Sequence, residues 1–367
     1  MLALLLAIPI VTVAFVKFYL KATYTWKEAA IHLVVVCALM IAGSEMGKYA
    51  SMSDTEILNG KITGKKRVHD QYTEYYDCNC TTTGSGSSKT TTCQTCTREH
   101  YTVDWLLHST IGNYTVKSLD SLSSSVYSTP DPRLYRITQK GDPCSKENTY
   151  LNYFRATPNS LQSAISTASV ETYRKKGLLP KYPHVYSLYK VKRVLDPGNK
   201  TPSGFEDQLS EHLSLELREL GAIKQVNILA VIAPTSDRNY RYALEQHWLG
   251  GKKNDVVVVM GVTDYPKVEW ADVITLAGNT NNEMLAVKLR DDIENIGDLS
   301  DTKAVSDVIT GNVKKHFNRM PMAEWEHLKE EYTPPFWLLI TLVLVNIALN
   351  AAFTWYFHRN DVKPTRR

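Results

Sequence analysis

Residues 336–357 read FWLLITLVLVNIALNAAFTWYF, a run without a single charged side chain. At about 1.5 Å of rise per residue, a helix of this length can cross a hydrocarbon core of about 30 Å. Trp337 lies at one end of the run, and Trp355 and Tyr356 lie at the other, as in the aromatic belts of membrane spans. The run therefore predicts a transmembrane helix.

Two further apolar segments lie near the N-terminus. Residues 2–20 carry no charge before Lys17, and residues 29–46 contain the core IHLVVVCALMIAG, which is short for a span. A cleaved signal peptide is the alternative for the first segment, although positive charge would then precede its apolar run. A buried core helix is the alternative for the second. We predict a helical hairpin over residues 1–46, and three transmembrane helices in all.

Basic residues set the expected orientation in the membrane. Lys17, Lys21 and Lys27 lie between the first two segments, and residues 359–367 form a basic tail. Because positive charge favours cytoplasmic loops, we predict a cytoplasmic C-terminus. The N-terminus and residues 47–334 are then expected on the extracytoplasmic side.

The segment at 336–357 also contains two carboxamides. Asn346 and Asn350 are four residues apart and share one helical face. An amide that faces lipid is costly, so we expect hydrogen bonds to the N-terminal hairpin, with His32 as a candidate partner, or to a second copy of the chain. Two tolerated asparagines in a lone anchor are the alternative.

Between the membrane segments the chain is polar and long enough for two domains. The 367 residues carry a formal net charge of +4, and the basic excess is dispersed. No run of Lys and Arg with interleaved aromatic residues is present, which argues against a nucleic-acid partner. We predict a β-rich subdomain over residues 47–200 and an α/β domain over residues 201–334.

The first of these regions shows the alternation that is typical of strands. Alternating, Tyr- and Thr-rich stretches occur at residues 67–77, 99–107 and 113–119. The polar run TTTGSGSSKTTT separates the first two and predicts a hairpin tip. We also expect a polar linker at 45–58, a strand within HVYSLYKVKRVL at 184–195, and a domain linker at 196–204.

After residue 203 the pattern becomes helical and aliphatic in turn. One helical stripe consists of Phe205, Leu209, Leu213, Leu217 and Leu220. Buried-type strands are predicted at residues 226–233, 255–262 and 267–275. Helices are predicted at residues 237–248, 282–296, 301–319 and 323–332. Strands that alternate with helices predict an α/β arrangement around a mixed sheet.

Four cysteines lie at the two feet of the polar hairpin tip. Cys78, Cys80, Cys93 and Cys96 have the spacing C-x-C-x12-C-x2-C. In one interpretation they form two disulfides, Cys80–Cys93 and Cys78–Cys96, in an oxidising compartment. These two pairs differ in register by one residue, so the hairpin would need a β-bulge. Cys144 is left over, either free or paired between chains.

The other interpretation of the cysteine cluster is a structural zinc site. Four thiolates can bind Zn²⁺ tetrahedrally, and His69 and His100 lie nearby as substitute ligands. Four protein ligands would leave no open position for catalysis. The cluster is therefore expected to be structural under both interpretations, and zinc is the single cofactor that the sequence suggests.

Residues 217–317 contain the strands VNILAVIAP and KVEWADVITLAG and the turn and strand KKNDVVVVMGV. This segment resembles a TPM domain, which occurs in membrane-anchored proteins of bacteria and thylakoids, some with acid phosphatase activity. The resemblance places Asn254 and Asp255 in the polar turn of that family, where Asn-Gly is usual. The layout of the whole chain is also similar to uncharacterised membrane proteins of tailed phages, which implies a phage-encoded protein.

A phosphatase of the TPM type would need carboxylates at strand ends that hold a metal ion and activate water. The candidates are Asp237, Asp255, Asp264, Asp272, Asp291 and Asp292. Structural interpretations compete with this one. Asp237 is placed to cap a helix, Asp264 lies in a turn sequence, and residues 291–292 fit a solvated helix face. Convergence of Asp237, Asp255 and Asp264 on one cleft would separate the two interpretations.

Other catalytic signatures are missing from the sequence. It contains no G-x-S-x-G, no H-E-x-x-H and no G-x-x-x-x-G-K-[ST]. The basic glycine turn GGKK at residues 250–253 is expected to end a helix at Gly250. We therefore predict a membrane-anchored, non-enzymatic protein that binds a protein or envelope partner, with a metal-dependent phosphatase of the TPM type as the alternative. A homo-oligomer through the third membrane segment is also expected.

Overall fold

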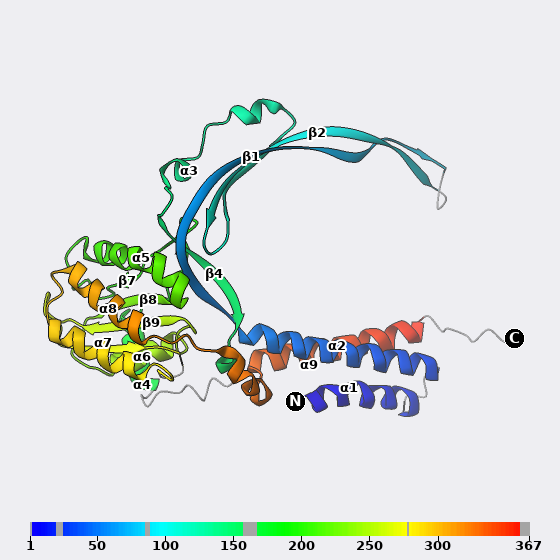
Figure 1. The fold of residues 1–367 in the computed structure, drawn as a ribbon. Coiled ribbons are helices and arrows are strands. Elements are labelled where there is room, and N and C mark those ends of the chain that lie inside the picture. The colour runs from blue at the N-terminus through cyan, green and yellow to red at the C-terminus, as the bar shows by residue number, and fades with distance from the viewer. Residues whose placement is uncertain (1, 20–24, 85–88, 157–166, 277–278, 360–367) are drawn as a thin grey trace. The chain divides into compact units, whose positions relative to one another are not determined.

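The computed structural model describes residues 2–19, 25–84, 89–156, 167–276 and 279–359 of the chain (Figure 1). These residues form a mixed α and β protein with two compact units. The first unit, here the helical unit, comprises Met1–Asp54, Thr149–Gln162 and Pro321–Arg367. The second unit, here the sheet unit, comprises Thr55–Asn148 and Ser163–Met320. The expected boundary near residue 200 falls inside the sheet unit.

Three helices dominate the helical unit: α1 (Leu2–Ala14), α2 (Trp26–Met52) and α9 (Phe336–Arg359). Among the described residues, α2 and the part of α9 up to Phe357 are long and apolar enough to cross a membrane. The apolar stretch of α1 and its π-helical extension η1 (Phe15–Tyr19) spans only Leu5–Phe18. At 1.5 Å per residue it is about 20 Å long, short of a hydrocarbon core. The prediction of three transmembrane helices is therefore corrected to two candidates.

Helix α2 is longer than the sequence pattern predicted. The expected linker at 45–58 is wrong, because α2 continues to Met52 and strand β1 (Ser53–Thr83) begins at the next residue. Close packing explains the continuation. A Cβ atom on Gly47 would lie 2.6 Å from Leu338, and one on Gly43 would lie 3.1 Å from Leu342. The two glycines thus allow α2 and α9 to approach closely instead of ending the helix.

Polar side chains inside the helical unit bond to one another as predicted. The Nε2 atom of His32 lies 3.0 Å from Oδ1 of Asn350, whose Nδ2 donates to Oδ1 of Asn346 at 2.7 Å. Asn346 in turn donates to the backbone carbonyl of Leu5. The expected hydrogen bonds from this asparagine pair to the N-terminal helices are confirmed. The unit also holds two 3-10 helices, η3 (Tyr153–Ala156) and η5 (Met322–Glu331), the second at a predicted α-helix.

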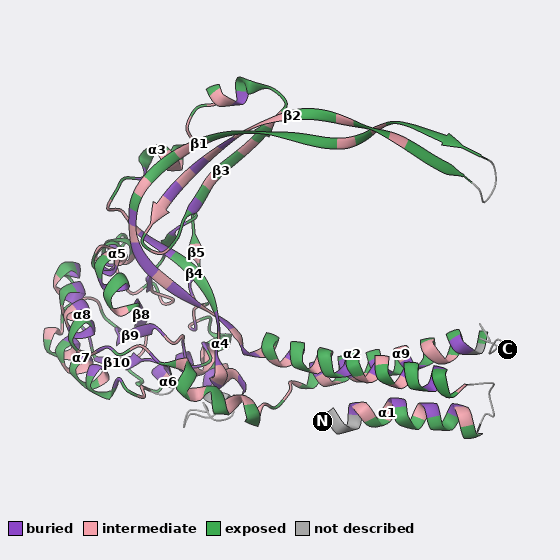
Figure 2. Cartoon of the chain, turned by 45° about the vertical axis from the view of Figure 1, so that its right-hand side comes forward, coloured by how far each residue is buried: buried purple, intermediate pink, exposed green. Residues whose placement is uncertain are grey.

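The first sheet of the sheet unit has the strand order β3-β2-β1-β4. Its other strands are β2 (Thr90–Ser109), β3 (Tyr114–Ser121) and β4 (Pro143–Leu151). Two small apolar clusters support it, around Leu107 and Tyr114 and around Trp105 and Val126. The short helices η2 (Ser124–Ser128) and α3 (Arg133–Ile137) follow β3. Figure 2 shows that the buried residues of this sheet lie outside the long two-stranded extension of β1 and β2.

The second sheet has the order β10-β9-β8-β7, with β7, β8 and β9 parallel and β10 antiparallel. Its strands are β7 (Val194–Leu195), β8 (Asn227–Ala233), β9 (Asp255–Gly261) and β10 (Trp270–Ile274). One apolar cluster joins it to α5 (Phe205–Lys224), α7 (Glu283–Ile296) and α8 (Thr302–His316). Another joins it to α4 (Thr167–Lys175) and α6 (Tyr240–His247). The five residues of the predicted α5 stripe are all buried, as expected.

Two predictions for the segment that links the two sheets along the chain, residues 184–204, are corrected. The strand predicted at 184–195 is broken into β5 (Val185–Tyr186), β6 (Lys190–Val191) and β7. Ser187 and Leu188 have positive φ angles of 47° and 75°, so the chain turns back on itself between β5 and β6. The segment at 196–204 is a turn inside the sheet unit, in which Asp196 accepts hydrogen bonds from the backbone and hydroxyl of Thr201.

Candidate functional site

The sheet unit carries a long two-stranded ribbon, here called the arm. It consists of Asp70–Thr83 of β1 and Thr90–Tyr101 of β2, which pair antiparallel. Strand β3 pairs with β2 only from Tyr101 to Leu107, so the sheet narrows to two strands at Tyr101 (Figure 1). No described residue of the arm is buried (Figure 2). The arm therefore presents both of its faces to solvent.

The arm has no aliphatic side chain with which to build a core. Its middle part exposes tyrosines, and Tyr75 is 72% exposed. Its distal part is almost entirely threonine, with Thr81, Thr82 and Thr83 paired across the ribbon to Thr92, Thr91 and Thr90. An isolated two-stranded ribbon is marginally stable in water. Something other than a hydrophobic core must hold the arm in one register.

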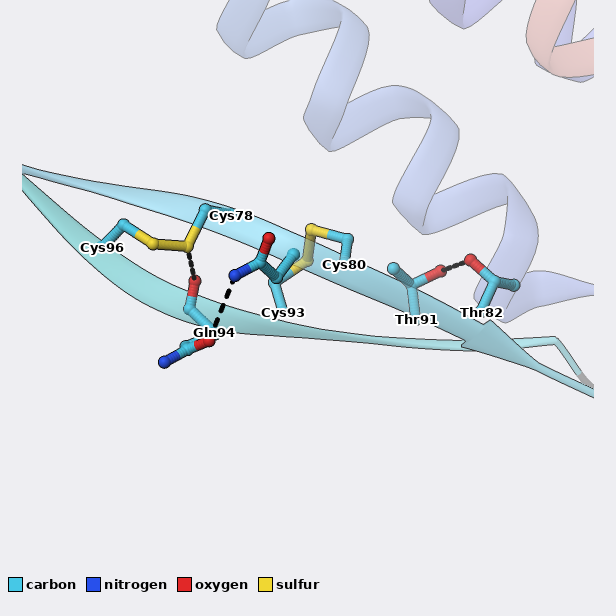
Figure 3. The surroundings of a disulfide bond; sticks show 8 residues. Cys78, Cys80, Thr82, Thr91, Cys93, Gln94 and Cys96 are labelled. Carbon is cyan, nitrogen blue, oxygen red and sulfur yellow. Dashed lines mark hydrogen bonds between the residues drawn. A yellow bond between two sulfur atoms is a disulfide. The ribbon is translucent and has the colours of Figure 1, made fainter.

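Two disulfides brace the arm near its tip, Cys78–Cys96 and Cys80–Cys93 (Figure 3). Cys78 lies opposite Gln94 and Thr81 lies opposite Thr92, so β1 has one residue more than β2 between these pairs. The extra residue is a bulge at Asn79, which has a φ of 47°. Both the pairing and the bulge of the disulfide interpretation are confirmed. In a chain-entropy model, one closure of about 15 residues contributes roughly 3 kcal/mol.

The zinc interpretation applies only to a reduced chain, because a sulfur atom in a disulfide is not a thiolate ligand. In the described part of the chain, no group of three or more His, Cys, Asp and Glu side chains is placed to hold a metal ion. His69, one substitute ligand, instead packs its ring 4.7 Å from that of Tyr127. Zinc at the reduced cysteines stays a prediction. Cys144 is a free thiol, buried beside Tyr114.

A cluster of polar side chains, here the His100 clamp, joins three strands at the root of the arm. His100 on β2 places Nδ1 2.6 Å from Oδ1 of Asp120 on β3, and Nε2 2.9 Å from Oε2 of Glu74 on β1. The ring of Tyr72 stacks on the imidazole, and its hydroxyl donates to Asp120 at 2.7 Å. These hydrogen bonds, first that to Asp120, raise the pKa of His100. The sequence had suggested only a substitute zinc ligand here.

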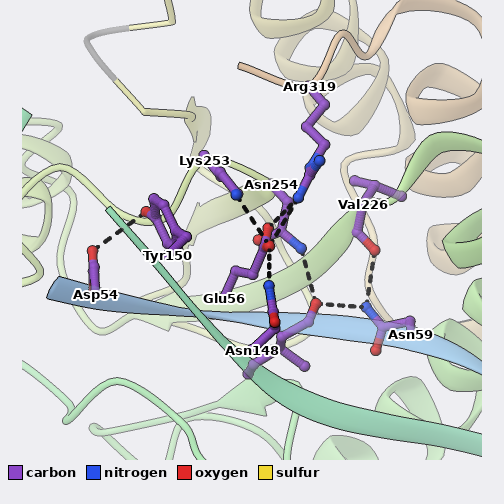
Figure 4. A network of polar contacts seen from close by, with 10 residues as sticks. Asp54, Glu56, Asn59, Asn148, Tyr150, Val226, Lys253, Asn254 and Arg319 are labelled. Atoms are coloured by element: carbon purple, nitrogen blue, oxygen red, sulfur yellow. Dashed lines mark hydrogen bonds and ion pairs between the residues drawn. The ribbon is translucent and has the colours of Figure 1, made fainter. Parts of the chain in front are cut away.

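A second polar cluster, here the Glu56 clasp, lies inside the sheet unit (Figure 4). The buried carboxylate of Glu56 accepts hydrogen bonds from Nη2 of Arg319 at 2.8 and 2.6 Å and from Nδ2 of Asn148 at 2.9 Å. Nζ of Lys253 lies 3.2 Å from it. Burial lowers the pKa of Lys253. No sequence pattern pointed to this cluster.

The position of the Glu56 clasp along the chain explains its importance. The chain passes between the two units four times, and three of these crossings come after Asp54, after Asn148 and after Met320. Glu56 follows the first of these crossings within two residues, and its partners Asn148 and Arg319 precede the other two. One carboxylate therefore gathers three of the segments through which the sheet unit is connected to the helical unit.

The residues that the TPM resemblance singled out lie in a closed internal network. Asn254 is fully buried and donates to the carbonyl of Ile57 at 2.9 Å. Asp255, the first residue of β9, accepts from the hydroxyl of Tyr182 at 3.0 Å and from Nδ2 of Asn227 at 2.9 Å. Burial raises the pKa of Asp255 to about 6. The network fastens strand β1 and the segment around Tyr182 to the second sheet.

Asp255 does not converge with Asp237 and Asp264. Asp255 begins β9, whereas Asp264 lies beyond the end of that strand and Asp237 lies beyond the end of the parallel strand β8. Strand β9 has seven residues, so its two ends are about 20 Å apart. Asp255 and the other two therefore do not share a cleft.

Local contacts account for the remaining candidates. Asp237 accepts from the backbone N–H of Asn239, at the start of α6. Asp272 lies 3.9 Å from Nε of Arg241. The carbonyl of Asp264 closes a turn, Asp291 pairs with the neighbouring Arg290, and Asp292 accepts from Asn312 on α8. The predicted C-cap at Gly250 is corrected, because α6 ends at His247 and its C-cap is Trp248; Gly250 lies two residues further on, where its N–H donates to the carbonyl of Glu245.

Comparison with known proteins found no family model, no curated protein and no solved structure that matches the chain.

Proposed function

We propose that this chain is a membrane-anchored, non-enzymatic protein that binds a protein or envelope partner through its arm. The observation that carries the proposal is the arm itself. It is exposed on both faces, contributes nothing to a core, and is nevertheless fixed by two disulfides and by the His100 clamp. A ribbon that is braced in this way without stabilising the rest of the unit is suited to present its side chains to another molecule.

The membrane arrangement that we propose follows from the two apolar helices and the basic residues. Helix α2 begins beside Lys27 and leads directly into β1, while α9 ends at Arg359, next to the basic tail. Positive charge at these ends favours the cytoplasm, which puts residues 47–334 outside it. The two disulfides fit an oxidising compartment on that side. This placement does not depend on whether α1 crosses the membrane; if it does, the N-terminus is extracytoplasmic too.

The TPM-like α/β classification and the phage-encoded origin belong to the proposal as well, and they rest on sequence resemblance. A metal-dependent phosphatase is the less favoured function. Asp255 lies at the opposite end of the strands from Asp237 and Asp264, and it is buried and accepts hydrogen bonds from Tyr182 and Asn227. A binding function requires none of these groups to meet.

Site-specific photo-crosslinking in membranes tests the proposal. A photoreactive residue at Tyr75 on the arm is compared with one at Ile223 on α5, because these side chains are 72% and 73% exposed. We expect an adduct with a discrete partner at position 75, none at position 223, and loss of the adduct when Cys78, Cys80, Cys93 and Cys96 are all replaced by serine. Identical adducts at both positions, or none at 75, would contradict the proposal. Metal-dependent hydrolysis of a phosphate ester by the full-length chain, abolished in Asp255→Asn, would favour the alternative.

A further inference from the structure

The two edges of the arm differ in how they are protected against pairing with another strand. In the distal part of the arm, β1 has the bulge at Asn79 and the charged residue Asp77. Bulges and charges are the usual devices that prevent an edge from accepting a further strand. The same part of β2 has neither, since residues 90–97 read TTTCQTCT without charge, glycine or proline, and the charged residues Arg98 and Glu99 lie outside this run. The β2 edge is therefore the one that is open to strand addition.

The same edge already accepts a strand at the root of the arm. Strand β3 pairs with β2 from Tyr101 to Leu107, and its end at Ser121 lies opposite Tyr101. Beyond that point, no strand in the described part of the chain pairs with the outer edge of residues 90–100. An added strand would thus lie in line with β3 and continue the sheet. It would also give the arm a third strand, which an isolated ribbon lacks.

We infer that the occupant of this edge is the β2 edge of a second copy of the chain, paired antiparallel about a two-fold axis. A two-fold interface brings the same patch of each copy together, so every charge in it meets charges of its own kind. Residues 90–97 contain no charge, and no antiparallel register within this run opposes like charges. At the β1 edge, the bulge at Asn79 would instead interrupt the ladder of hydrogen bonds. Membrane anchoring confines the copies to one surface and raises their effective concentration.

This self-association goes beyond the proposed binding function. It uses the edge of β2, whereas the partner of the proposed function is sought on the exposed faces of the arm. Main-chain hydrogen bonds would supply the affinity, as in other cases of strand addition. Four strands in the order β1-β2-β2-β1 would result from two arms.

Crosslinking between two differently tagged full-length copies, co-expressed in membranes, tests the inference. A photoreactive residue at Thr95 on β2 is compared with one at Asp77, its directly paired neighbour on β1. The two residues are directly opposite each other in the ribbon, but Thr95 is on the strand with the β2 edge and Asp77 is on the strand with the β1 edge. We expect adducts that contain both tags at position 95 and at least several-fold fewer at position 77. Adducts that are equal at the two sites, or absent at 95, would overturn the inference.

A charge introduced into the edge separates specific pairing from mere proximity. With the photoreactive residue at Thr97, the variant Thr95→Lys should reduce the two-tag adduct several-fold, whereas Thr95→Ser should retain it. Thiol labelling checks that both variants keep the two disulfides, so misfolding cannot account for a loss. If the copies co-purify but Thr95→Lys has no effect, self-association through the helices is the explanation and the edge pairing is rejected. An adduct with another protein at Tyr75 would persist in either case.

Discussion

Asn346 on α9 donates a hydrogen bond of 2.7 Å to the carbonyl of Leu5, the one carbonyl of α1 that Pro9 deprives of its helical donor. In an α-helix the carbonyl of residue 5 accepts from the N–H of residue 9, and proline has none. An unsatisfied backbone carbonyl in hydrocarbon costs several kcal/mol. The carboxamide of Asn346 therefore complements a defect in another helix and holds α1 in the helical unit.

This relationship predicts a specific suppression. Asn346→Leu should destabilise the full-length chain in detergent by about 1 kcal/mol, in the range measured for hydrogen bonds between membrane helices. Pro9→Ala gives the carbonyl of Leu5 its own donor, so Asn346→Leu should cost less in a Pro9→Ala background. Thermal unfolding of the four members of this double-mutant cycle provides the measurement. Strictly additive effects would show that the two residues are not coupled.

The helical pairings could be predicted from sequence because they depend on local spacing. Asn346 and Asn350 are four residues apart on an apolar helix, and a buried amide requires a partner. Pro9 leaves one carbonyl of α1 without a helical donor, which can be read from the sequence. Only the fold shows that Asn346 supplies the missing donor. The predicted helix was shorter than α2, because glycines such as Gly43 and Gly47 often mark the end of a helix. In the structure these two glycines leave space for leucine side chains of α9.

The arm was largely predictable from the sequence, and the Glu56 clasp was not. Under the disulfide interpretation the cysteine spacing predicted the pairing and the need for a bulge, but it did not decide between disulfides and zinc, and the structure places the bulge at Asn79. Glu56, Asn148 and Arg319 are far apart in sequence and meet only where the chain crosses between the units. A single sequence carries no spacing that reveals such a contact.

The Glu56 clasp predicts a large stability effect at one buried carboxylate. Glu56→Ala leaves Lys253 and Arg319 facing each other without an anion, and breaking a buried ion pair costs about 3–5 kcal/mol. Because the side chain of Arg319 is 30% exposed, we expect roughly 3 kcal/mol, the lower end of that range. Amide hydrogen exchange at the start of β1 should rise accordingly.

A surface ion pair of the same unit supplies the matched control. Lys61 and Glu219 are 2.7 Å apart, with side chains 38% and 56% exposed. Glu219→Ala should have a much smaller effect on stability than Glu56→Ala, because exposed ion pairs contribute little. Equal effects of the two substitutions would show that Glu56 is not a clasp.

The His100 clamp predicts a pH-dependent arm root. Both imidazole nitrogens face carboxylates, and only the protonated ring can donate from both. The pKa of His100 is raised in the folded chain, so the clamp is fully stabilising below about pH 6.5, the unfolded value, and weakens as the pH rises through the folded value. Hydrogen exchange around Tyr72 and Glu74, corrected for its intrinsic pH dependence, should increase over that interval.

Two variants decide whether His100 is responsible for this titration. His100→Gln should abolish the pH dependence at the arm root. His108→Gln should preserve it, because His108 lies on β2 outside the clamp and bonds to Asn113. The negative groups that face the ring are Asp120 and Glu74, and Glu99 adds a further attraction. A root that becomes more protected at high pH would contradict this account.

The two disulfides should stabilise the arm but not the rest of the sheet unit. The bonds are nested, so loss of Cys80–Cys93 leaves the ribbon closed at Cys78–Cys96, and replacement of all four cysteines by serine is needed to release the tip. Trypsin should then cleave after Lys89 and Arg98 much faster than in the chain with both bonds. Because no residue of the arm is buried, the thermal midpoint of the sheet unit should stay nearly unchanged. A fall in that midpoint equal to the loss of tip protection would mean that the arm supports the fold, and its assignment as a presented surface would fail.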